Sequence, residues 1–92
     1  MTKSVHVIVE GKVQGVWYRA WVLGAAQKLG LFGWVRNKSN GQVEAVFCGD
    51  IAKVDKMIEQ CWHGSPPSSV SNVTVSPADK IADPRFVVIK SS

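Results

Sequence analysis

The centre of the chain, from residue 32 to residue 48, reads FGWVRNKSNGQVEAVFC. Runs rich in β-branched and aromatic residues flank Asn40-Gly41, and an Asn-Gly pair is the strongest short-range hairpin signal because both residues accept positive φ. We therefore expect two paired antiparallel strands over residues 32–38 and 42–48. One face of the second strand would carry Val43, Ala45 and Phe47.

A helix is predicted on each side of this hairpin. Before it, the apolar residues recur at helical spacing from Ala20 onward, and Gly30 supplies a C-terminal stop. After it, Asp50 is a suitable N-cap for a helix that ends by Gly64. The first helix would bury Val22, Ala25, Ala26 and Leu29, and the second would bury Ile51, Val54, Ile58 and Cys61.

Further strands are predicted outside the two helices. Valine at every second position indicates strands over residues 5–10 and 71–76, and residues 86–90 can add a shorter strand. This order predicts an α+β fold, a ferredoxin-like βαββαβ sandwich. Its antiparallel sheet would carry two helices on one face and a short C-terminal extra strand. Because this fold hosts many functions, the chemistry must come from particular residues.

Length and composition limit the class of protein. Ninety-two residues suit one domain, so we expect residues 1–92 to form a single domain. Hydrophobic residues make up 46% and charged residues 20%, which is typical of a globular protein. No apolar run approaches the ~20 residues that span a bilayer, and the N-terminus does not resemble a signal peptide. Cys48 and Cys61 are too few for a disulfide framework, so we expect a reduced, cytoplasmic protein.

Charge and local helix signals point to an anionic ligand. The net charge is +4, which favours anionic partners. Residues 11–20 read GKVQGVWYRA and lead into the first helix without a capping side chain or an acidic first turn. Arg19 adds positive charge at the positive end of the helix dipole, and Gly15 allows the backbone to approach a ligand closely. A phosphate would accept hydrogen bonds from the free N–H groups and from the guanidinium of Arg19.

No other kind of catalytic centre is indicated. The Walker pattern for nucleotide phosphates is absent, and His6, His63 and the two cysteines lack metal-ligand spacing. No Ser-His-Asp or Cys-His arrangement can be assembled. The sequence therefore predicts a phosphate site without an evident acid, base or nucleophile, and no metal.

Two stretches resemble the signatures of the acylphosphatase family. Residues 11–19 are similar to Gly-x-Val-Gln-Gly-Val-x-aromatic-Arg, with Trp17 at the variable position. Residues 32–37, FGWVRN, resemble the second signature, and Gly41, Val43 and Gly49 follow at the expected intervals. The resemblance covers essentially the whole chain, although the part after about Ser65 carries no diagnostic residue.

The resemblance implies hydrolysis of acyl phosphates by a small free-standing enzyme without metal or organic cofactor. It assigns phosphate binding to Arg19 and orientation of the attacking water to Asn37. A cradle of backbone N–H groups would hold the phosphoryl oxygens. Its members are Gln14, Gly15, Val16, Trp17, Tyr18 and Arg19. We expect a monomer that binds phosphate or sulfate as competing anions and has no nucleic-acid or membrane partner.

Two non-catalytic alternatives stay open. Residues 32–37 overlap the aromatic motif of RNA-recognition modules, which share the predicted fold. However, the leading basic residue and glycine are replaced, Asn37 stands where the last aromatic belongs, and the motif falls on the second strand instead of the third. The other alternative is an anion-binding module that serves regulation or forms part of a larger maturation enzyme.

Overall fold

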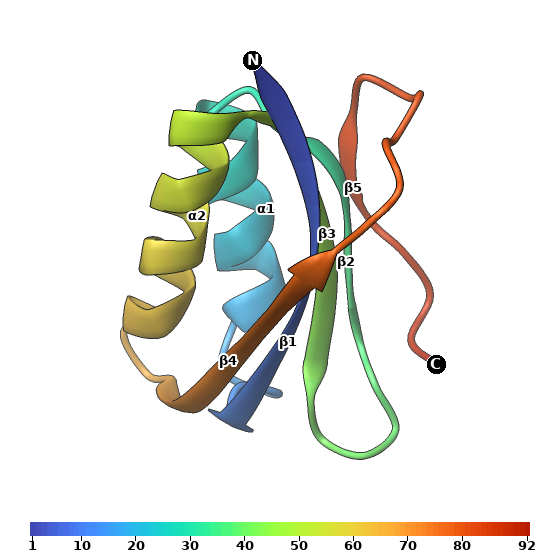
Figure 1. The fold of residues 1–92 in the computed structure, drawn as a ribbon. Helices are drawn as coiled ribbons and strands as arrows, with labels where there is room; N and C mark the ends of the chain where they lie inside the picture. Colours follow the sequence, from blue (N-terminus) through green and yellow to red (C-terminus); the bar gives the residue numbers. More distant parts are fainter.

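A computed structural model describes all 92 residues and contains a five-stranded sheet with two helices packed on one face (Figure 1). The predicted ferredoxin-like sandwich is therefore confirmed. In chain order the elements are β1 (Thr2–Lys12), α1 (Tyr18–Lys28), β2 (Phe32–Asn37), β3 (Val43–Asp50), α2 (Ile51–His63), β4 (Ser69–Pro77) and β5 (Phe86–Val88). Neither helix is long and apolar enough to cross a membrane.

The strand order is β4-β1-β3-β2-β5, and one pair of neighbours is parallel. The first four strands are antiparallel neighbours, but β5 runs parallel to β2. After β4 the chain crosses to the opposite edge of the sheet and reverses direction before it reaches β2 (Figure 1). The expected short C-terminal strand is thus present, and it joins the edge of the antiparallel sheet as a parallel strand.

The central hairpin is confirmed, but its turn differs from the expected one. Gly41 alone takes positive φ, +91°, whereas Asn40 does not. The Lys38 N–H donates to the Gln42 carbonyl at 2.8 Å, which closes a three-residue loop. Asn40 contributes through its side chain, whose Oδ1 accepts the Gln42 N–H at 3.1 Å. Such a loop, with glycine in its last position, is the next most common hairpin type after the two-residue turn.

The core lies between the helices and one sheet face. The predicted valines of β1 and the apolar face of β3 are buried, together with Tyr18, Val22 and Ala26 of α1. From α2, Val54 and Cys61 are buried as expected, but Met57 takes the place predicted for Ile51 and Ile58, which are only partly buried. Ala25 and Leu29 are also only partly buried. Both cysteines are buried free thiols.

The two helices begin differently from the sequence-based expectations. Helix α1 begins at Tyr18, two residues before the expected Ala20, because the Trp21 N–H donates to the Trp17 carbonyl at 3.0 Å and closes an additional turn. Asp50 occupies the N-cap of α2, but its side chain makes no capping hydrogen bond. The predicted position of that cap is therefore right, whereas the predicted capping bond is absent.

Candidate active site

The loop between β1 and α1 forms a backbone cradle. Val13 and Val16 point into the core, whereas Gly15 and Trp17 are exposed. Gly15 and Trp17 take φ values of +72° and +66°, and Val16 between them has a negative φ. A change in the sign of φ between consecutive residues turns their N–H groups toward one side, and this is the backbone geometry of anion-binding nests. No N–H from residue 14 to residue 20 donates to an acceptor of the chain.

A β-bulge directs the chain from β1 into this cradle. The pairing of β1 with β4 shifts register between Glu10 and Gly11, and Gly11 has a φ of +121°. A Cβ atom at Gly11 would collide with the backbone of Ser69 and Ser71. Only glycine fits this close approach, so the first glycine of the stretch 11–20 aims the loop that follows it.

Helix α1 adds the positive end of its dipole to the cradle. Its N-cap, Trp17, makes no side-chain capping bond, and its first turn contains no acidic residue. The predicted absence of a cap is confirmed. Arg19 lies in this first turn and forms no ion pair, whereas the other two arginines of the chain, Arg36 and Arg85, are paired with Glu44 and Asp83. Arg19 is thus the one guanidinium free to meet an incoming anion.

The structure brings Arg19 and Asn37 to one hollow, although the two residues come from different elements. This hollow has a volume of about 450 Å³ and is lined by Val13, Gly15, Trp17, Tyr18, Arg19, Ala20 and Asn37. Asn37 ends β2, and its buried Oδ1 has no hydrogen-bond partner in the chain. A buried unpartnered acceptor costs about 1–3 kcal/mol, so Asn37 Oδ1 is a polar atom that the fold itself leaves unsatisfied.

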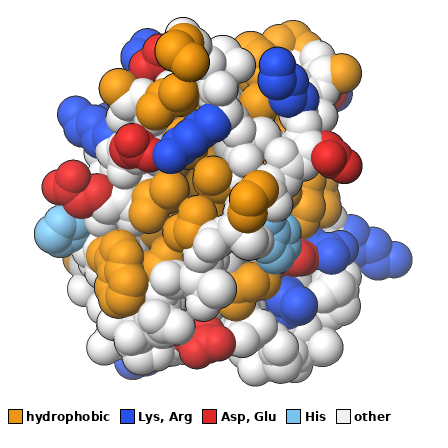
Figure 2. All heavy atoms as spheres, viewed as in Figure 1, with side chains coloured by type: hydrophobic (Ala, Val, Ile, Leu, Met, Phe, Trp, Pro, Cys, Tyr) orange, Lys and Arg blue, Asp and Glu red, His pale blue; other side chains and the backbone are white.

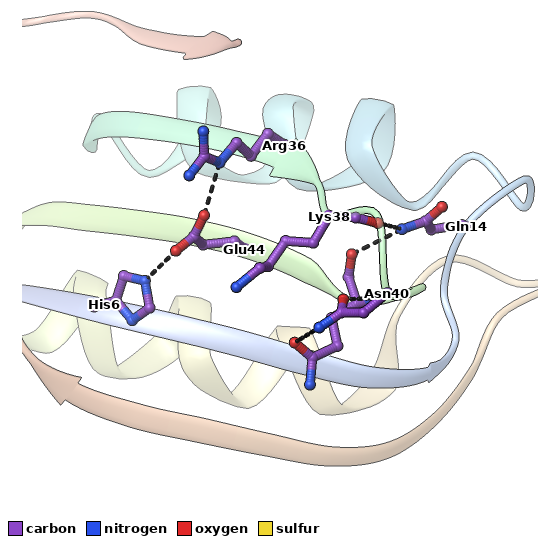
Figure 3. Close-up of polar contacts among 7 residues, drawn as sticks. His6, Gln14, Arg36, Lys38, Asn40 and Glu44 are labelled. Carbon is purple, nitrogen blue, oxygen red and sulfur yellow. Dashed lines mark hydrogen bonds and ion pairs between the residues drawn. The ribbon is translucent and has the colours of Figure 1, made fainter. Parts of the chain in front are cut away.

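The cradle is tied to two neighbouring segments. The Gln14 side-chain amide donates to the carbonyls of Lys38 and Gln42, at 2.7 and 2.9 Å, and so fixes the loop to the β2–β3 hairpin (Figure 3). On the other side, the Ser65 hydroxyl donates to the Val16 carbonyl at 2.8 Å. Gln14 and Val16, both predicted cradle members, therefore do not line the hollow but hold its wall in place.

These supports were not identified as such from the sequence. Gln14 was expected to act through its backbone, and its side-chain bonds span at least 24 residues of chain. Ser65 lies in the proline-rich loop after α2 and reaches Val16 across 49 residues. No local signal marks Ser65, since a single serine beside prolines is ordinary loop composition.

Trp17 carries the backbone strain of the site. Its φ of +66° is the only positive value among the non-glycine residues. The left-handed region brings Cβ too close to the following carbonyl and costs a side-chain-bearing residue roughly 1–2 kcal/mol. At 80% exposure, the indole recovers little of that cost by packing. Strain of this kind gathers at functional sites, where the surrounding structure maintains it.

The remaining titratable groups near the hollow offer no nucleophile. The Tyr18 hydroxyl donates to the Cys61 carbonyl at 2.7 Å, and burial raises the pKa of this phenol well above its ordinary value. Burial likewise raises the pKa of the Cys61 thiol to about 12, so this thiol stays protonated at neutral pH. No group of three or more His, Cys, Asp or Glu side chains is arranged to hold a metal ion. The chemistry available at the hollow is therefore binding and orientation of an anion.

A separate ionic cluster lies away from the cradle. The Glu44 carboxylate lies 2.6 Å from His6 Nε2 and accepts a bond from Arg36 Nε at 2.7 Å (Figure 3). Burial tends to raise the pKa of Glu44, but the bonds from His6 and Arg36 outweigh it and hold this pKa below its ordinary value. The cluster joins β1, β2 and β3 and stabilises the sheet from which Asn37 extends.

Comparisons with known proteins agree on one family. The acylphosphatase family model matches residues 5–88. The chain is 45% identical to an acylphosphatase of Rhodospirillum rubrum, over 91% of this chain and 92% of that protein. It is 56% identical to an acylphosphatase of Haloquadratum walsbyi, over 77% of this chain and 76% of that protein. The solved structure of an acylphosphatase from Coxiella burnetii matches with a TM-score of 0.92 at 40% identity, covering 96% of this chain and 93% of that one.

Proposed function

Since the chain belongs to the acylphosphatase family, hydrolases that act on acyl phosphates, we propose that the hollow lined by Arg19 and Asn37 is its active site. The observation that carries this proposal is the meeting of three features in one place. The hollow lies at an uncapped helix N-terminus and is lined by an arginine without an acidic partner and by an asparagine whose buried amide oxygen has no donor.

The phosphoryl group binds in the cradle. The free N–H groups of the β1–α1 loop and of the start of α1 donate hydrogen bonds to its oxygens, and Arg19 adds charge-assisted hydrogen bonds. Phosphoryl transfer needs little covalent help from the protein, and positioning and charge stabilisation supply most of the rate. The cradle therefore serves the ground state and also stabilises the charge that develops on the phosphoryl oxygens.

Asn37 orients the nucleophile. Its Oδ1 accepts a hydrogen bond from a water molecule, which then attacks phosphorus in line with the leaving group. The new bond joins the water oxygen to phosphorus, and the bond between phosphorus and the acyl oxygen breaks. The electron pair of that bond leaves with the carboxylate, and both water protons end on the released dihydrogen phosphate, which then equilibrates with solvent. A carboxylate has low proton affinity, so the step needs no general acid.

The reaction is proposed to need no metal, which is consistent with the lack of a clustered donor set. Turnover should therefore be the same in chelator as in buffer. We also propose that residues 1–92 act as a single domain, monomeric and cytoplasmic, and the family match over residues 5–88 supports the first of these points. Sedimentation or gel filtration of the purified chain tests the second.

Nucleic acid is not proposed as a partner. The Arg36 guanidinium, in the segment that overlapped the RNA-binding motif, is paired with Glu44 and lies over the Trp34 ring at 5.3 Å. Basic and acidic side chains are interspersed on the face shown in Figure 2 and do not form a continuous basic surface there. Salt-dependent retention of single-stranded RNA by the protein would contradict this part of the proposal.

A continuous assay with benzoyl phosphate tests the proposed function. We expect release of benzoate and phosphate in proportion to enzyme, with inorganic phosphate acting as a competitive inhibitor. Hydrolysis no faster than in buffer alone would overturn the proposal.

A further inference from the structure

Trp17 stands at a position where the fold itself favours a different residue. Its backbone lies in the left-handed region, which glycine enters freely and asparagine enters more readily than most residues. Glycine and asparagine are also both accepted at a helix N-cap, the position that Trp17 holds. The indole is 80% exposed, so packing does not explain the choice of tryptophan.

The neighbours of Trp17 show that the exposure of its side chain is built into the loop. Val16 and Tyr18 on either side are buried, and Tyr18 is held by its bond to the Cys61 carbonyl. With both neighbours anchored inward, the left-handed backbone at Trp17 presents its side chain outward. Because Trp17 also lines the hollow, its side chain stands at the edge of the proposed phosphoryl site.

The volume and the lining side chains of the hollow suit a ligand larger than a phosphoryl group. Its volume of about 450 Å³ falls in the range of pockets that hold small organic ligands, roughly 300–1,000 Å³. Arg19 is its only charged lining residue, and the other polar groups on its lining side chains are the Asn37 amide, the Tyr18 phenol and the Trp17 indole N–H. The Tyr18 hydroxyl is already engaged with Cys61. Once Arg19 binds the phosphoryl group, no charged group is left for the acyl part.

We propose that Trp17 is a specificity-determining residue, whose indole contacts the acyl group of the substrate and favours flat aromatic acyl groups over small aliphatic ones. This inference rests on the proposed function, since it takes the hollow to be the acyl phosphate site. In an aromatic acyl phosphate the ring is attached directly to the carboxyl carbon, so it lies next to the phosphoryl group. An indole at the edge of the cradle can therefore stack with it or meet it edge to face.

The test compares two substrates that share the reacting group. The ratio of kcat/KM for benzoyl phosphate to kcat/KM for acetyl phosphate isolates the acyl contact, because any change in the cradle affects both substrates. Trp17→Gly and Trp17→Asn keep the backbone N–H and accept the left-handed conformation, and Trp17→Phe keeps an aromatic ring. Trp62→Ala is the matched control, since Trp62 is also exposed, at 48%, but does not line the hollow.

We expect the ratio to fall about tenfold in Trp17→Gly and Trp17→Asn, the scale of one lost aromatic contact, and to stay near the wild-type value in Trp17→Phe and Trp62→Ala. An unchanged ratio in both Trp17→Gly and Trp17→Asn would overturn the proposal. So would an equal fall in Trp62→Ala, because the effect would then not be local to the hollow.

A binding measurement separates this inference from the proposed function. Benzoylphosphonate and acetylphosphonate carry a carbon–phosphorus bond, so they occupy the site without hydrolysis. The wild-type protein should bind benzoylphosphonate more tightly than acetylphosphonate. The ratio of the two dissociation constants should move about tenfold toward one in Trp17→Gly. If neither acyl phosphate is hydrolysed, the proposed function fails, whereas equal affinity of the wild-type protein for both phosphonates defeats the role of Trp17.

Discussion

Replacement of Asn37 by alanine should separate catalysis from stability. The buried Oδ1 of Asn37 has no hydrogen-bond partner in the chain. Truncation therefore breaks no hydrogen bond to this oxygen. It also removes a buried acceptor, whose desolvation costs about 1–3 kcal/mol when it is unpartnered. We expect Asn37→Ala to have a free energy of unfolding equal to or higher than that of the wild-type protein.

Catalysis should respond in the opposite direction. Loss of one preorganised polar group that meets the reacting water lowers kcat by about 10²–10³-fold. The inhibition constant of inorganic phosphate should stay within about twofold, because the cradle and Arg19 bind the phosphoryl oxygens without help from Asn37. This combination, with stability kept, phosphate affinity kept and turnover lost, would be hard to obtain from a merely structural residue.

The assay combines benzoyl phosphate kinetics, phosphate inhibition and urea unfolding on the same preparations. Asn72→Ala is the matched control, because Asn72 is exposed on β4 and does not line the hollow. We expect this control to retain wild-type kcat. Loss of phosphate affinity in Asn37→Ala as severe as in an Arg19 variant would refute the reasoning, since Asn37 would then be a ligand of the phosphoryl group.

Four further predictions follow from the contacts at the site and in the sheet. Arg19→Gln should weaken phosphate inhibition as well as turnover, by the ~1.5–3 kcal/mol of a charge-assisted bond. Arg19→Lys should recover little of this loss, because an ammonium lacks the planar fork of a guanidinium. Equal phosphate inhibition in the wild-type protein and both variants would contradict this prediction. Ser65→Ala leaves the Val16 carbonyl unpaired, so it should destabilise the fold by about 1–3 kcal/mol in urea unfolding and lower kcat/KM. Glu44→Gln should destabilise the protein by about 1–3 kcal/mol at neutral pH. Because folding lowers the pKa of Glu44, this difference should be complete above the ordinary value of 4.5 and vanish as the pH falls through the lower folded value; a gap independent of pH would exclude a role for the charge. Phosphate and sulfate should inhibit competitively and raise the Tm with concentration, whereas noncompetitive inhibition would place the anion elsewhere.

Local sequence signals were sufficient for the order of elements and for the prediction of an anion site at the start of α1. The hairpin around Asn40-Gly41 and the two flanking helices follow from short-range preferences, which act between residues close along the chain. The same holds for the uncapped start of α1, since a missing cap and a basic first turn are visible in a few consecutive residues. Arg19 could therefore be proposed as an anion ligand before any fold was known.

Asn37 could not be placed in the same way. On its own it reads as a residue at the end of a strand, and only its resemblance to a family signature suggested a role. The tertiary structure brings it to Arg19, because the ends of β2 and of the β1–α1 loop meet at one end of the sandwich. That meeting depends on strand order and register, which join segments that are distant along the chain.

The supports of the site were likewise decided by tertiary contacts. The hydrogen bonds from Gln14 to the hairpin and from Ser65 to Val16 link segments that are distant along the chain. Neither composition nor residue spacing predicts them. The parallel pairing of β5 and the left-handed backbone of Trp17 are likewise features that the sequence alone did not predict. The sequence by itself determined which segments fold and where positive charge meets a helix N-terminus, because those are short-range energies. The assembly of the hollow was left to long-range packing, because only the folded sheet brings its parts within contact distance.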